Sequence, residues 1–223
     1  VTGLGTVSPV GQSLDEIWSN LTAGKSGIRN ITCRPIGKLT CGIAGEVPDF
    51  DPTEYMEKKQ ARRMDRYMQL AMAAAKLAYK DSGLNGNIDA ERAGVVIGSG
   101  AGGIGTIETQ LFKAFENGFH RTSPFLVPMM LCDSAAGCVS IEYGIKGPNM
   151  AVVTACATGT NSIGEAKRLI ENDEADIMFA GGAEAPVAGL AIAGFSAARA
   201  LSTRPGDPKL ASRPFDKDRD GFV

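Results

Sequence analysis

The sequence predicts an α/β protein with a mostly parallel sheet that is covered by helices on both faces. Short apolar runs, such as Ala93 to Gly98, alternate along the chain with longer segments in which apolar residues recur at helical spacing. Continuously apolar runs are typical of strands that are buried on both faces. Many of the 28 glycines follow these runs directly, which indicates tight strand-to-helix turns at the sheet edge where α/β proteins place their sites.

The pattern in the first third of the chain predicts the end of one strand and two helices. Val1 to Gly5 reads as the end of a strand. Leu14 to Ala23 is predicted to be a helix capped by Ser13, whose hydroxyl can accept a hydrogen bond from the first turn. Gln60 to Asp81, rich in alanine and methionine, is predicted to be one long helix that ends at Gly83.

The rest of the chain alternates regularly between predicted strands and predicted helices. The predicted strands are Ala93 to Gly98, Met150 to Ala155 and Asp176 to Gly181; the predicted helical segments are Thr106 to Asn117, Pro128 to Tyr143 and Asn161 to Asn172. A strand followed by a helix and a parallel strand is the repeating unit of this fold class.

Composition excludes several classes of function. The chain has 223 residues, of which 43% are hydrophobic and 22% charged, which is enough apolar material for a domain core. A formal net charge of −2 predicts no nucleic-acid partner and no membrane partner. The apolar runs all fall short of the roughly 18 residues that a membrane span needs, and the N-terminus lacks the pattern of a signal peptide.

The cysteines indicate a reducing compartment. There are five, an odd number, and none forms a C-x-x-C pair: Cys33, Cys41, Cys132, Cys138 and Cys156. A disulfide framework and a zinc site are therefore not expected, and we predict a cytoplasmic location, or a plastid if the source is a eukaryote. The chain starts without a methionine and stops within a strand-like pattern, so we expect it to be part of a longer protein.

Cys156 stands between the predicted strand Met150 to Ala155 and the predicted helix Asn161 to Asn172. A thiol there lies among the first N–H groups of the helix, whose partial positive charge favours thiolate over thiol. Cys156 is therefore a candidate nucleophile. The alternative is a small buried apolar residue, which is the role of most free cysteines.

Two short motifs imitate ligand sites. Gly98 to Gly105 contains G-x-G-x-x-G, but the acidic residue that a dinucleotide site needs about 20 residues later is missing from a second strand. Asp216 to Gly221 copies half of a calcium loop, but the preceding proline excludes an entering helix. The sequence thus predicts no nucleotide cofactor and no metal.

Four blocks in order carry a resemblance to a known family. They are TACATG at Thr154 to Gly159, DIMFAGGAE at Asp176 to Glu184, GFSAARALS at Gly194 to Ser202, and RPFDKDRDGFV at Arg213 to Val223. The chain resembles the β-ketoacyl-[acyl carrier protein] synthases, and most closely their elongating type II. The resemblance implies a thiolase-like fold of two similar α/β halves, of which residues 1–223 are the first, with the second half absent from this chain.

The resemblance also implies a chemistry. Cys156 takes an acyl chain from the phosphopantetheine arm of acyl carrier protein, and its backbone N–H contributes to an oxyanion hole. Decarboxylation of malonyl carrier protein then drives a Claisen condensation, and no further cofactor is needed. The family's two catalytic histidines lie in the second half, whereas this chain has one histidine, His120, outside both motifs. The chain alone is therefore expected to be an incomplete catalyst.

Four cations in the predicted helix Gln60 to Asp81 and just before it follow the spacing of one helical face. Lys59, Arg62, Arg63 and Arg66 recur at i, i+3, i+4 and i+7. Such a face is usually only solvated. The resemblance implies instead that Lys59, Arg62 and Arg63 dock the acidic acyl carrier protein.

The resemblance assigns further roles. It places Ala101 and Phe195 in the acyl pocket, where Ala101 leaves room for a longer chain; a tight turn and simple core packing are the respective alternatives. It also predicts a homodimer, with Pro128 to Tyr143 at the contact and the strand Met150 to Ala155 paired across the dimer axis.

Other functions share parts of this pattern. A polyketide ketosynthase shares the condensation chemistry, and a thiolase-fold acyltransferase shares the fold and the cysteine. A chain-length-factor subunit is a non-catalytic relative that usually lacks the cysteine. The least functional alternative is a half-domain fragment without activity.

Overall fold

The computed structural model describes residues 1–32, 41–86 and 88–223, which form two compact units. The first unit comprises residues 1–5 and 51–185, and the second comprises residues 6–50 and 186–223. Cys33, one of the five cysteines, lies outside the described residues.

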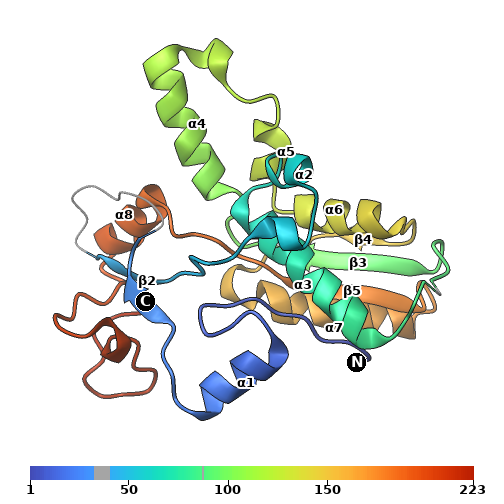
Figure 1. Cartoon of the computed structure of the whole chain (residues 1–223), viewed down its shortest axis with the longest axis horizontal. Helices are drawn as coiled ribbons and strands as arrows, with labels where there is room; N and C mark the ends of the chain where they lie inside the picture. Colours follow the sequence, from blue (N-terminus) through green and yellow to red (C-terminus); the bar gives the residue numbers. More distant parts are fainter. Residues whose placement is uncertain (33–40, 87) are drawn as a thin grey trace. The chain divides into compact units, whose positions relative to one another are not determined.

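The first unit is built on a three-stranded parallel sheet with the order β4-β3-β5 (Figure 1). The central strand β3 (Ala93–Gly98) is buried along its whole length. It pairs with β5 (Ile177–Gly182) on one side and with the short β4 (Asn149–Met150) on the other. The predicted parallel sheet is therefore confirmed, and β3 and β5 end together because Gly98 lies opposite Gly182.

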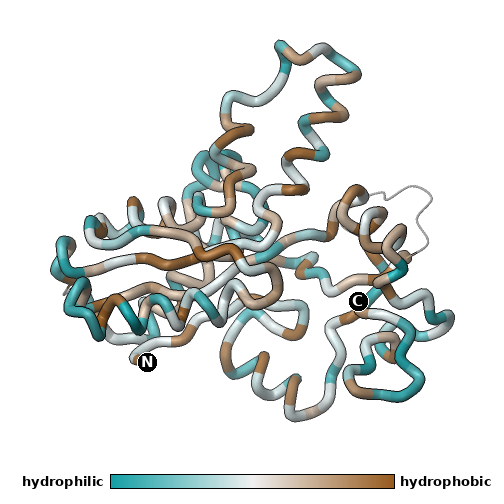
Figure 2. Tube along the Cα trace, turned by 180° about the vertical axis from the view of Figure 1, so that it is seen from behind, coloured by the Kyte–Doolittle hydropathy of each residue, from teal (hydrophilic) through white to brown (hydrophobic). Residues whose placement is uncertain are grey.

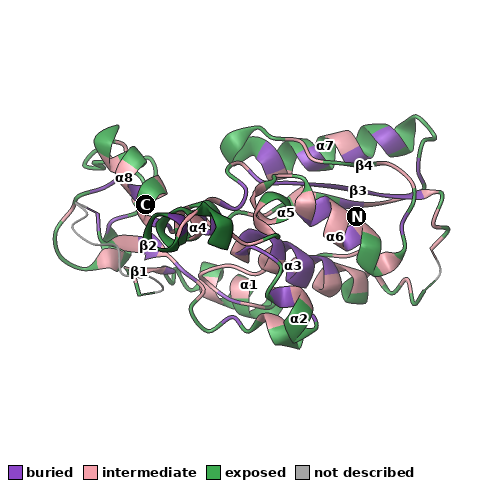
Figure 3. Cartoon of the chain, turned by 90° about the horizontal axis from the view of Figure 1, so that it is seen from above, coloured by how far each residue is buried: buried purple, intermediate pink, exposed green. Residues whose placement is uncertain are grey.

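Helices cover both faces of this sheet, as predicted. Figure 3 shows α7 (Thr158–Glu171) on one side of β3, and α6 (Ser134–Tyr143) and α3 (Arg66–Ser82) on the other. Successive side chains of β3 point to opposite faces of the sheet, because side chains alternate along a strand. Val95 packs in the core with α3 and α6, whereas Val96 packs with α7.

The prediction of one long helix over Gln60 to Asp81 is wrong, because the helix is interrupted between α2 (Lys58–Ala61) and α3. Asp65 causes the break: its backbone is extended and its carboxylate caps α3 by accepting from the N–H of Tyr67. The predicted end of this helix is confirmed, since Gly83 adopts the left-handed conformation at its C-cap.

A helical hairpin rises from the sheet in Figure 1. It consists of α4 (Ile104–Asn117), the turn η2 (Phe119–Arg121) and α5 (Leu126–Met130). The single helical stretch predicted over Pro128 to Tyr143 is wrong, because α5 and α6 are separated at Leu131, whose backbone is extended. The carbonyl of Leu131 instead accepts a hydrogen bond from the buried Tyr67 hydroxyl, and burial raises the pKa of that phenol.

The N-terminal segment Val1 to Gly5 lies along α3 and forms no strand, contrary to the prediction. A methyl group at Gly5 would lie 2.0 Å from the carbonyl oxygen of Ala74, so only glycine permits this approach. The N–H of Leu4 donates to Asp81 at 2.8 Å.

The second unit has a small core of its own. Its elements are α1 (Leu14–Thr22), an antiparallel pair of β1 (Ile28–Asn30) and β2 (Ile43–Gly45), and α8 (Gly189–Ala197). The helix predicted over Leu14 to Ala23 is confirmed, and Ser13 caps it by accepting from the N–H of Glu16. The pair β1–β2 was not predicted, because strands of three residues show too little alternation to detect.

The acidic turn near the C-terminus is held by protein groups. Asp220 accepts from the Ser202 hydroxyl at 2.7 Å and from the N–H of Thr203 at 2.9 Å. Over the described ranges, no group of three or more potential ligands is placed to hold a metal ion. Within the same ranges, every helix is too short or too polar to cross a membrane.

Each unit also contains a short helical turn that begins with a proline. These turns are η1 (Pro52–Glu54) in the first unit and η4 (Pro208–Leu210) in the second. Each is capped by an aspartate directly before its proline, in agreement with the preference of proline for the first helical position.

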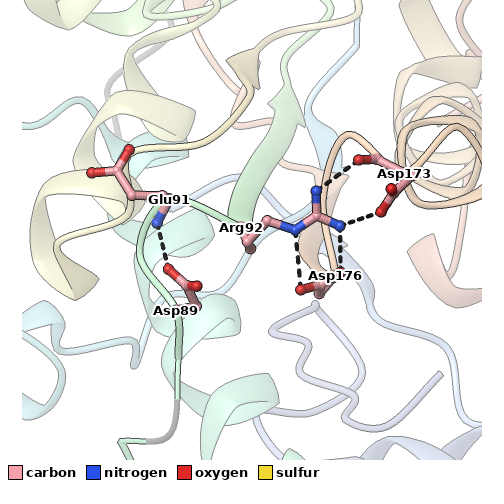
Figure 4. A network of polar contacts seen from close by, with 5 residues as sticks. All are labelled: Asp89, Glu91, Arg92, Asp173 and Asp176. Atoms are coloured by element: carbon pink, nitrogen blue, oxygen red, sulfur yellow. Dashed lines mark hydrogen bonds and ion pairs between the residues drawn. The ribbon is translucent and has the colours of Figure 1, made fainter.

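An arginine fixes the end of the sheet opposite the glycine turns. The Arg92 guanidinium holds Asp176 in a bidentate pair, with distances of 3.2 and 2.6 Å, and also donates to the Asp173 carbonyl at 2.7 Å (Figure 4). Asp173 needs this support, because its φ of +62° is rare for a residue with a side chain. Arg92 therefore fastens the turn between α7 and β5 to the start of β3.

This network predicts a loss of stability in acid. The hydrogen bond from Arg92 lowers the pKa of Asp176, so the folded state binds the proton less readily than the unfolded state. The stabilisation is complete above the ordinary aspartate pKa of about 3.9 and is lost as the pH falls through the lower folded value.

The free energy of unfolding, measured with urea, is expected to differ less between about pH 7 and about pH 3 in Asp176→Asn than in wild type. Asp89→Asn is the matched control, because that carboxylate caps the N–H of Glu91 in the same region. An equal pH dependence in wild type and Asp176→Asn contradicts the assignment.

Candidate active site

The candidate nucleophile follows a strand that ends early. The buried strand predicted over Met150 to Ala155 is wrong, because β4 stops at Met150 and both of its residues are exposed. The chain then turns sharply at Ala155, where φ is +51°, and Cys156 occupies the middle of the helical turn η3 (Ala155–Ala157). Such a left-handed backbone costs an alanine about 1 kcal/mol, and backbone strain of this kind collects at functional sites.

Thr154 organises the loop before the cysteine. Its N–H donates to the Thr158 hydroxyl at 3.0 Å, its carbonyl accepts from the N–H of Ala157 at 3.1 Å, and its hydroxyl accepts from the Asn161 amide at 2.8 Å. Thr158 and Asn161 belong to α7, so these hydrogen bonds fix the loop that bears Cys156 to the start of the helix.

Cys156 is the exposed thiol among the four cysteines that the structure describes. Cys41 is buried, and Cys132 and Cys138 are partly buried. Burial raises the pKa of the Cys132 and Cys138 thiols, which makes both poorer nucleophiles. The alternative that Cys156 is a small buried apolar residue is therefore wrong.

The glycine turn after β3 is required by close packing around this loop. A methyl group at Gly98 would lie 2.1 Å from the carbonyl oxygen of Val152 and 2.8 Å from a methyl of Thr158. The missing Cβ of Gly182 would lie 3.0 Å from the backbone of Gly159 in α7, which is also a tight contact. The glycines thus let the ends of β3 and β5 approach residues 151–157, the loop that bears Cys156 and is called the nucleophile loop below.

Ala101 lies in the first unit, in a turn that approaches the nucleophile loop. Ala101 is exposed in the turn after β3, and its neighbour Gly100 has its missing Cβ 3.3 Å from Cα of Ala155. Phe195 belongs to the second unit, where it lies in α8, is 48% exposed and makes an edge-to-face contact with Phe222 at 5.2 Å.

Glu184 is a site residue that sequence reasoning did not single out. Its carboxylate accepts from the Ser99 hydroxyl at 3.0 Å and from the N–H groups of Gly100 and Ala101 at 2.7 and 3.0 Å. The available signal was its place two residues beyond β5, beside the glycine turn that follows the neighbouring parallel strand β3.

The basic residues lie around the break in the helix and do not form the predicted helical face. Lys59 is in α2, Arg62 and Arg63 follow it, and Arg66 begins α3. Lys59, Arg62 and Arg63 are exposed, and in the part of the chain that the structure describes none of the three forms an ion pair. The Arg63 guanidinium lies over the Phe125 ring, 4.6 Å from its centroid.

Comparison with known proteins places this chain in a family. The family model of the β-ketoacyl synthase N-terminal domain matches residues 1–223. The chain belongs to the β-ketoacyl synthase family. The resemblance seen in the sequence is therefore confirmed, and Cys156 lies in the TACATG block that carried it.

Two curated relatives of this chain share a name. A Synechocystis protein named 3-oxoacyl-[acyl-carrier-protein] synthase 2 is 47% identical over 224 residues, and a Staphylococcus aureus protein of the same name is 49% identical over 224 residues. Both alignments cover all of this chain but only 54% and 55% of the relatives. The chain thus spans about half the length of these relatives.

Solved ketosynthases share the fold. A β-ketoacyl synthase from Burkholderia phymatum has a TM-score of 0.86 at 32% identity, over 100% of this chain and 55% of its own. The ishigamide ketosynthase/chain length factor has a TM-score of 0.88 at 32% identity, over 99% of this chain and 54% of its own. The predicted thiolase-like fold is thereby confirmed.

Proposed function

We propose that the protein is a 3-oxoacyl-[acyl carrier protein] synthase II of fatty acid biosynthesis and that Cys156 is its acyl-accepting nucleophile. The observation that carries the proposal is the exposed thiol on a strained turn at the start of α7. The names of the curated relatives support the reaction and its pathway. A reducing compartment, the cytoplasm in a bacterium, suits a catalyst that depends on a free thiol.

The proposed reaction has two steps at one sulfur. The Cys156 thiolate attacks the thioester of acyl carrier protein, forms an acyl–cysteine thioester and releases the carrier thiol. Malonyl carrier protein then loses carbon dioxide, and the resulting carbanion attacks the acyl carbonyl. The bond from carbonyl carbon to Cys156 sulfur breaks, which yields 3-oxoacyl carrier protein and the free thiolate.

The tetrahedral intermediate of each step needs hydrogen-bond donors for its oxyanion. The N–H of Cys156 is available for this role, because it has no acceptor among the residues that the structure describes. We propose it as one donor. The chain's one histidine, His120, is exposed in η2, so we propose that the two family histidines come from the other half of the full-length enzyme.

We propose Ala101 and Phe195 as acyl-pocket residues, as the family resemblance implies. The position of Ala101 supports its role, since it is exposed on the turn that touches the nucleophile loop. Its small side chain is expected to leave room for a long acyl chain. No cofactor beyond the substrate's phosphopantetheine arm is proposed.

We propose that the enzyme is a homodimer. Large apolar side chains are exposed on the hairpin and on α6 of the first unit: Phe112, Phe115, Phe119, Val127 and Ile141. An exposed apolar surface of this kind indicates a protein contact. The exposed edge of β4 supports the same proposal, because an unpaired strand edge readily pairs with another chain.

Lys59, Arg62 and Arg63 are proposed to dock acyl carrier protein. The polyketide ketosynthase AntDE, whose fold matches with a TM-score of 0.83 at 31% identity, was solved in complex with its acyl carrier protein. That complex supports a carrier-protein partner for this chain as well. Exposed cations without ion pairs remain available to an acidic partner.

Charge reversal at Arg62 tests the docking surface. We expect Arg62→Glu to weaken binding of acyl carrier protein by about 10-fold or more at low salt, and by less at high salt because screening reduces the repulsion. Titration by calorimetry at two salt concentrations measures both effects. Arg63→Glu is less clean because Arg63 also stacks on Phe125.

Lys80→Glu is the matched control for this test. Lys80 is an exposed cation at the end of α3 in the same unit, so the variant has the same change in net charge. Equal affinities of the two variants for acyl carrier protein contradict docking at Arg62.

The proposed function is tested with the full-length protein. Acyl carrier protein loaded with a labelled acyl chain is expected to label Cys156, and malonyl carrier protein is then expected to release carbon dioxide and form 3-oxoacyl product. Mass spectrometry of the protein and of the product monitors both steps. Label at another residue, or none, contradicts the proposal.

A polyketide ketosynthase is the second candidate, because one matching solved structure is the ketosynthase of a type II polyketide synthase and another is a ketosynthase/chain length factor. The two functions differ in the oxidation state of the acyl chain that is condensed. A fatty acid synthase condenses a fully reduced acyl chain, whereas a polyketide ketosynthase extends acyl chains that keep their keto groups. Preference for a 3-oxoacyl over a saturated acyl substrate in the same assay favours the second candidate.

A further inference from the structure

The turn after β3 presents three consecutive backbone N–H groups that need acceptors. They belong to Gly100, Ala101 and Gly102, and side-chain oxygens of Ser99 and Glu184 accept from all three. The Ser99 hydroxyl accepts from Gly102 at 3.0 Å, while one oxygen of Glu184 accepts from both Gly100 and Ala101. The other oxygen of Glu184 accepts from the Ser99 hydroxyl, so a single carboxylate closes the whole network.

The sheet places Glu184 at this point. β3 and β5 run in parallel to Gly98 and Gly182, and one further hydrogen bond, from the N–H of Ala183 to the carbonyl of Gly98, continues their pairing. The next residue of each chain segment leaves the sheet. Glu184 therefore emerges beside the turn and reaches it across 85 positions of sequence to Ser99.

The same network touches the nucleophile loop. The missing Cβ of Gly100 lies 2.9 Å from Glu184 and 3.3 Å from Cα of Ala155, so this part of the turn is close to both the carboxylate and the residue before Cys156. The missing Cβ of Gly102 lies 2.4 Å from the carbonyl oxygen of Met130. A displaced turn therefore changes the surroundings of Ala155, the residue directly before Cys156.

Glu184 is itself exposed, whereas Ser99 is 1% exposed. Water can thus replace the carboxylate as an acceptor for the N–H groups of Gly100 and Ala101. Only the Ser99 hydroxyl, which is buried, loses its acceptor, so the loss of Glu184 is expected to cost a small part of the folding stability. A water molecule is not tied to the chain, however, so it does not fix these N–H groups relative to β5. The carboxylate contributes position more than stability.

We propose that Glu184 is a positioning residue that fixes the turn bearing Ala101 against the nucleophile loop, and that it thereby helps to set which acyl chain lengths reach Cys156. The proposal rests on the function proposed above. It assigns no contact between Glu184 and substrate. Glu184 acts through the N–H groups of Gly100 and Ala101.

Two variants of the full-length protein separate the acceptor from the charge. Glu184→Ala removes every acceptor, whereas Glu184→Gln keeps one oxygen that can accept from both N–H groups while its amide donates to Ser99. Glu171→Ala is the control, because Glu171 is an exposed glutamate at the end of α7. The first readout is hydrogen exchange of the Gly100 and Ala101 amides, and the second is the ratio of rates with a long-chain and a medium-chain acyl carrier protein.

We expect Glu184→Ala to speed exchange at both amides by about 10-fold and to shift the rate ratio by about 5-fold, with a melting temperature close to that of wild type. Glu184→Gln and Glu171→Ala are expected to retain both wild-type values. Unchanged exchange in Glu184→Ala overturns the proposal. So does a Glu184→Gln variant that is as impaired as Glu184→Ala.

The two readouts keep the proposals apart. If wild type transfers no acyl group to Cys156, the proposed function fails, and the exchange measurement still decides whether Glu184 holds the turn. If wild type is active and Glu184→Ala changes exchange without changing the rate ratio, the positioning of the acyl chain is refuted while the function stands.

Discussion

Replacing Cys156 with alanine is expected to abolish acyl transfer by the full-length enzyme, with a loss of about 10³-fold or more. The sulfur is the atom to which the acyl group becomes attached, and no other described thiol is exposed. The substitution removes only the thiol of an exposed side chain, so the fold is expected to remain intact. Mass spectrometry after incubation with labelled acyl carrier protein measures the acyl–enzyme directly.

Cys138→Ala serves as the control for this prediction. Cys138 lies in α6, partly buried, and burial raises the pKa of its thiol. We expect this variant to become acylated as wild type does. Persistent labelling of Cys156→Ala at another residue contradicts the assignment of the nucleophile.

Asp65→Ala is expected to lower the free energy of unfolding by about 3 to 5 kcal/mol, through the loss of a buried acceptor. Asp65 is 5% exposed and ties two helices together. It accepts from the N–H of Tyr67 at the start of α3, and from the N–H and hydroxyl of Thr106 in α4 at 3.0 and 2.6 Å. Alanine leaves these three donors buried without a partner.

Asp51→Ala is the matched control, because Asp51 makes the same kind of contact at the surface. It accepts from the N–H and hydroxyl of Thr53 at 2.8 and 2.7 Å, but it is exposed, so water can replace it. We expect a much smaller loss from this variant in urea unfolding. Equal losses for Asp51→Ala and Asp65→Ala would show that burial of Asp65 is unimportant.

The elements that sequence predicted correctly are those whose signals are local. Ser13 caps α1 through a residue three positions away, and Gly83 ends α3 through its own backbone conformation. The run Ala93 to Gly98 forms β3 because an entirely apolar segment of this length is stable only where both faces are covered. Cys156 could be proposed as the nucleophile on a signal that is equally local, since it stands beside a helix start that periodicity reveals.

The two helices that sequence predicted as unbroken were interrupted by bonds to distant partners. The helix predicted from Gln60 breaks because Asp65 also bonds Thr106, which lies 41 positions away. The helix predicted from Pro128 breaks at Leu131, whose carbonyl bonds Tyr67 across 64 positions. Helical periodicity continues through both breaks and contains no trace of either partner.

The sequence by itself determined the α/β class and the family and singled out Cys156 as the candidate nucleophile, because apolar period, capping residues and motif order are properties of neighbouring positions. Only the tertiary structure decided the left-handed turn at Ala155, the exposure of Cys156 and the contacts of Glu184. The physical reason is that an unsatisfied N–H or carboxylate finds its partner through space. In this chain the parallel register of β3 and β5 brings Glu184 to Gly100 across 84 positions.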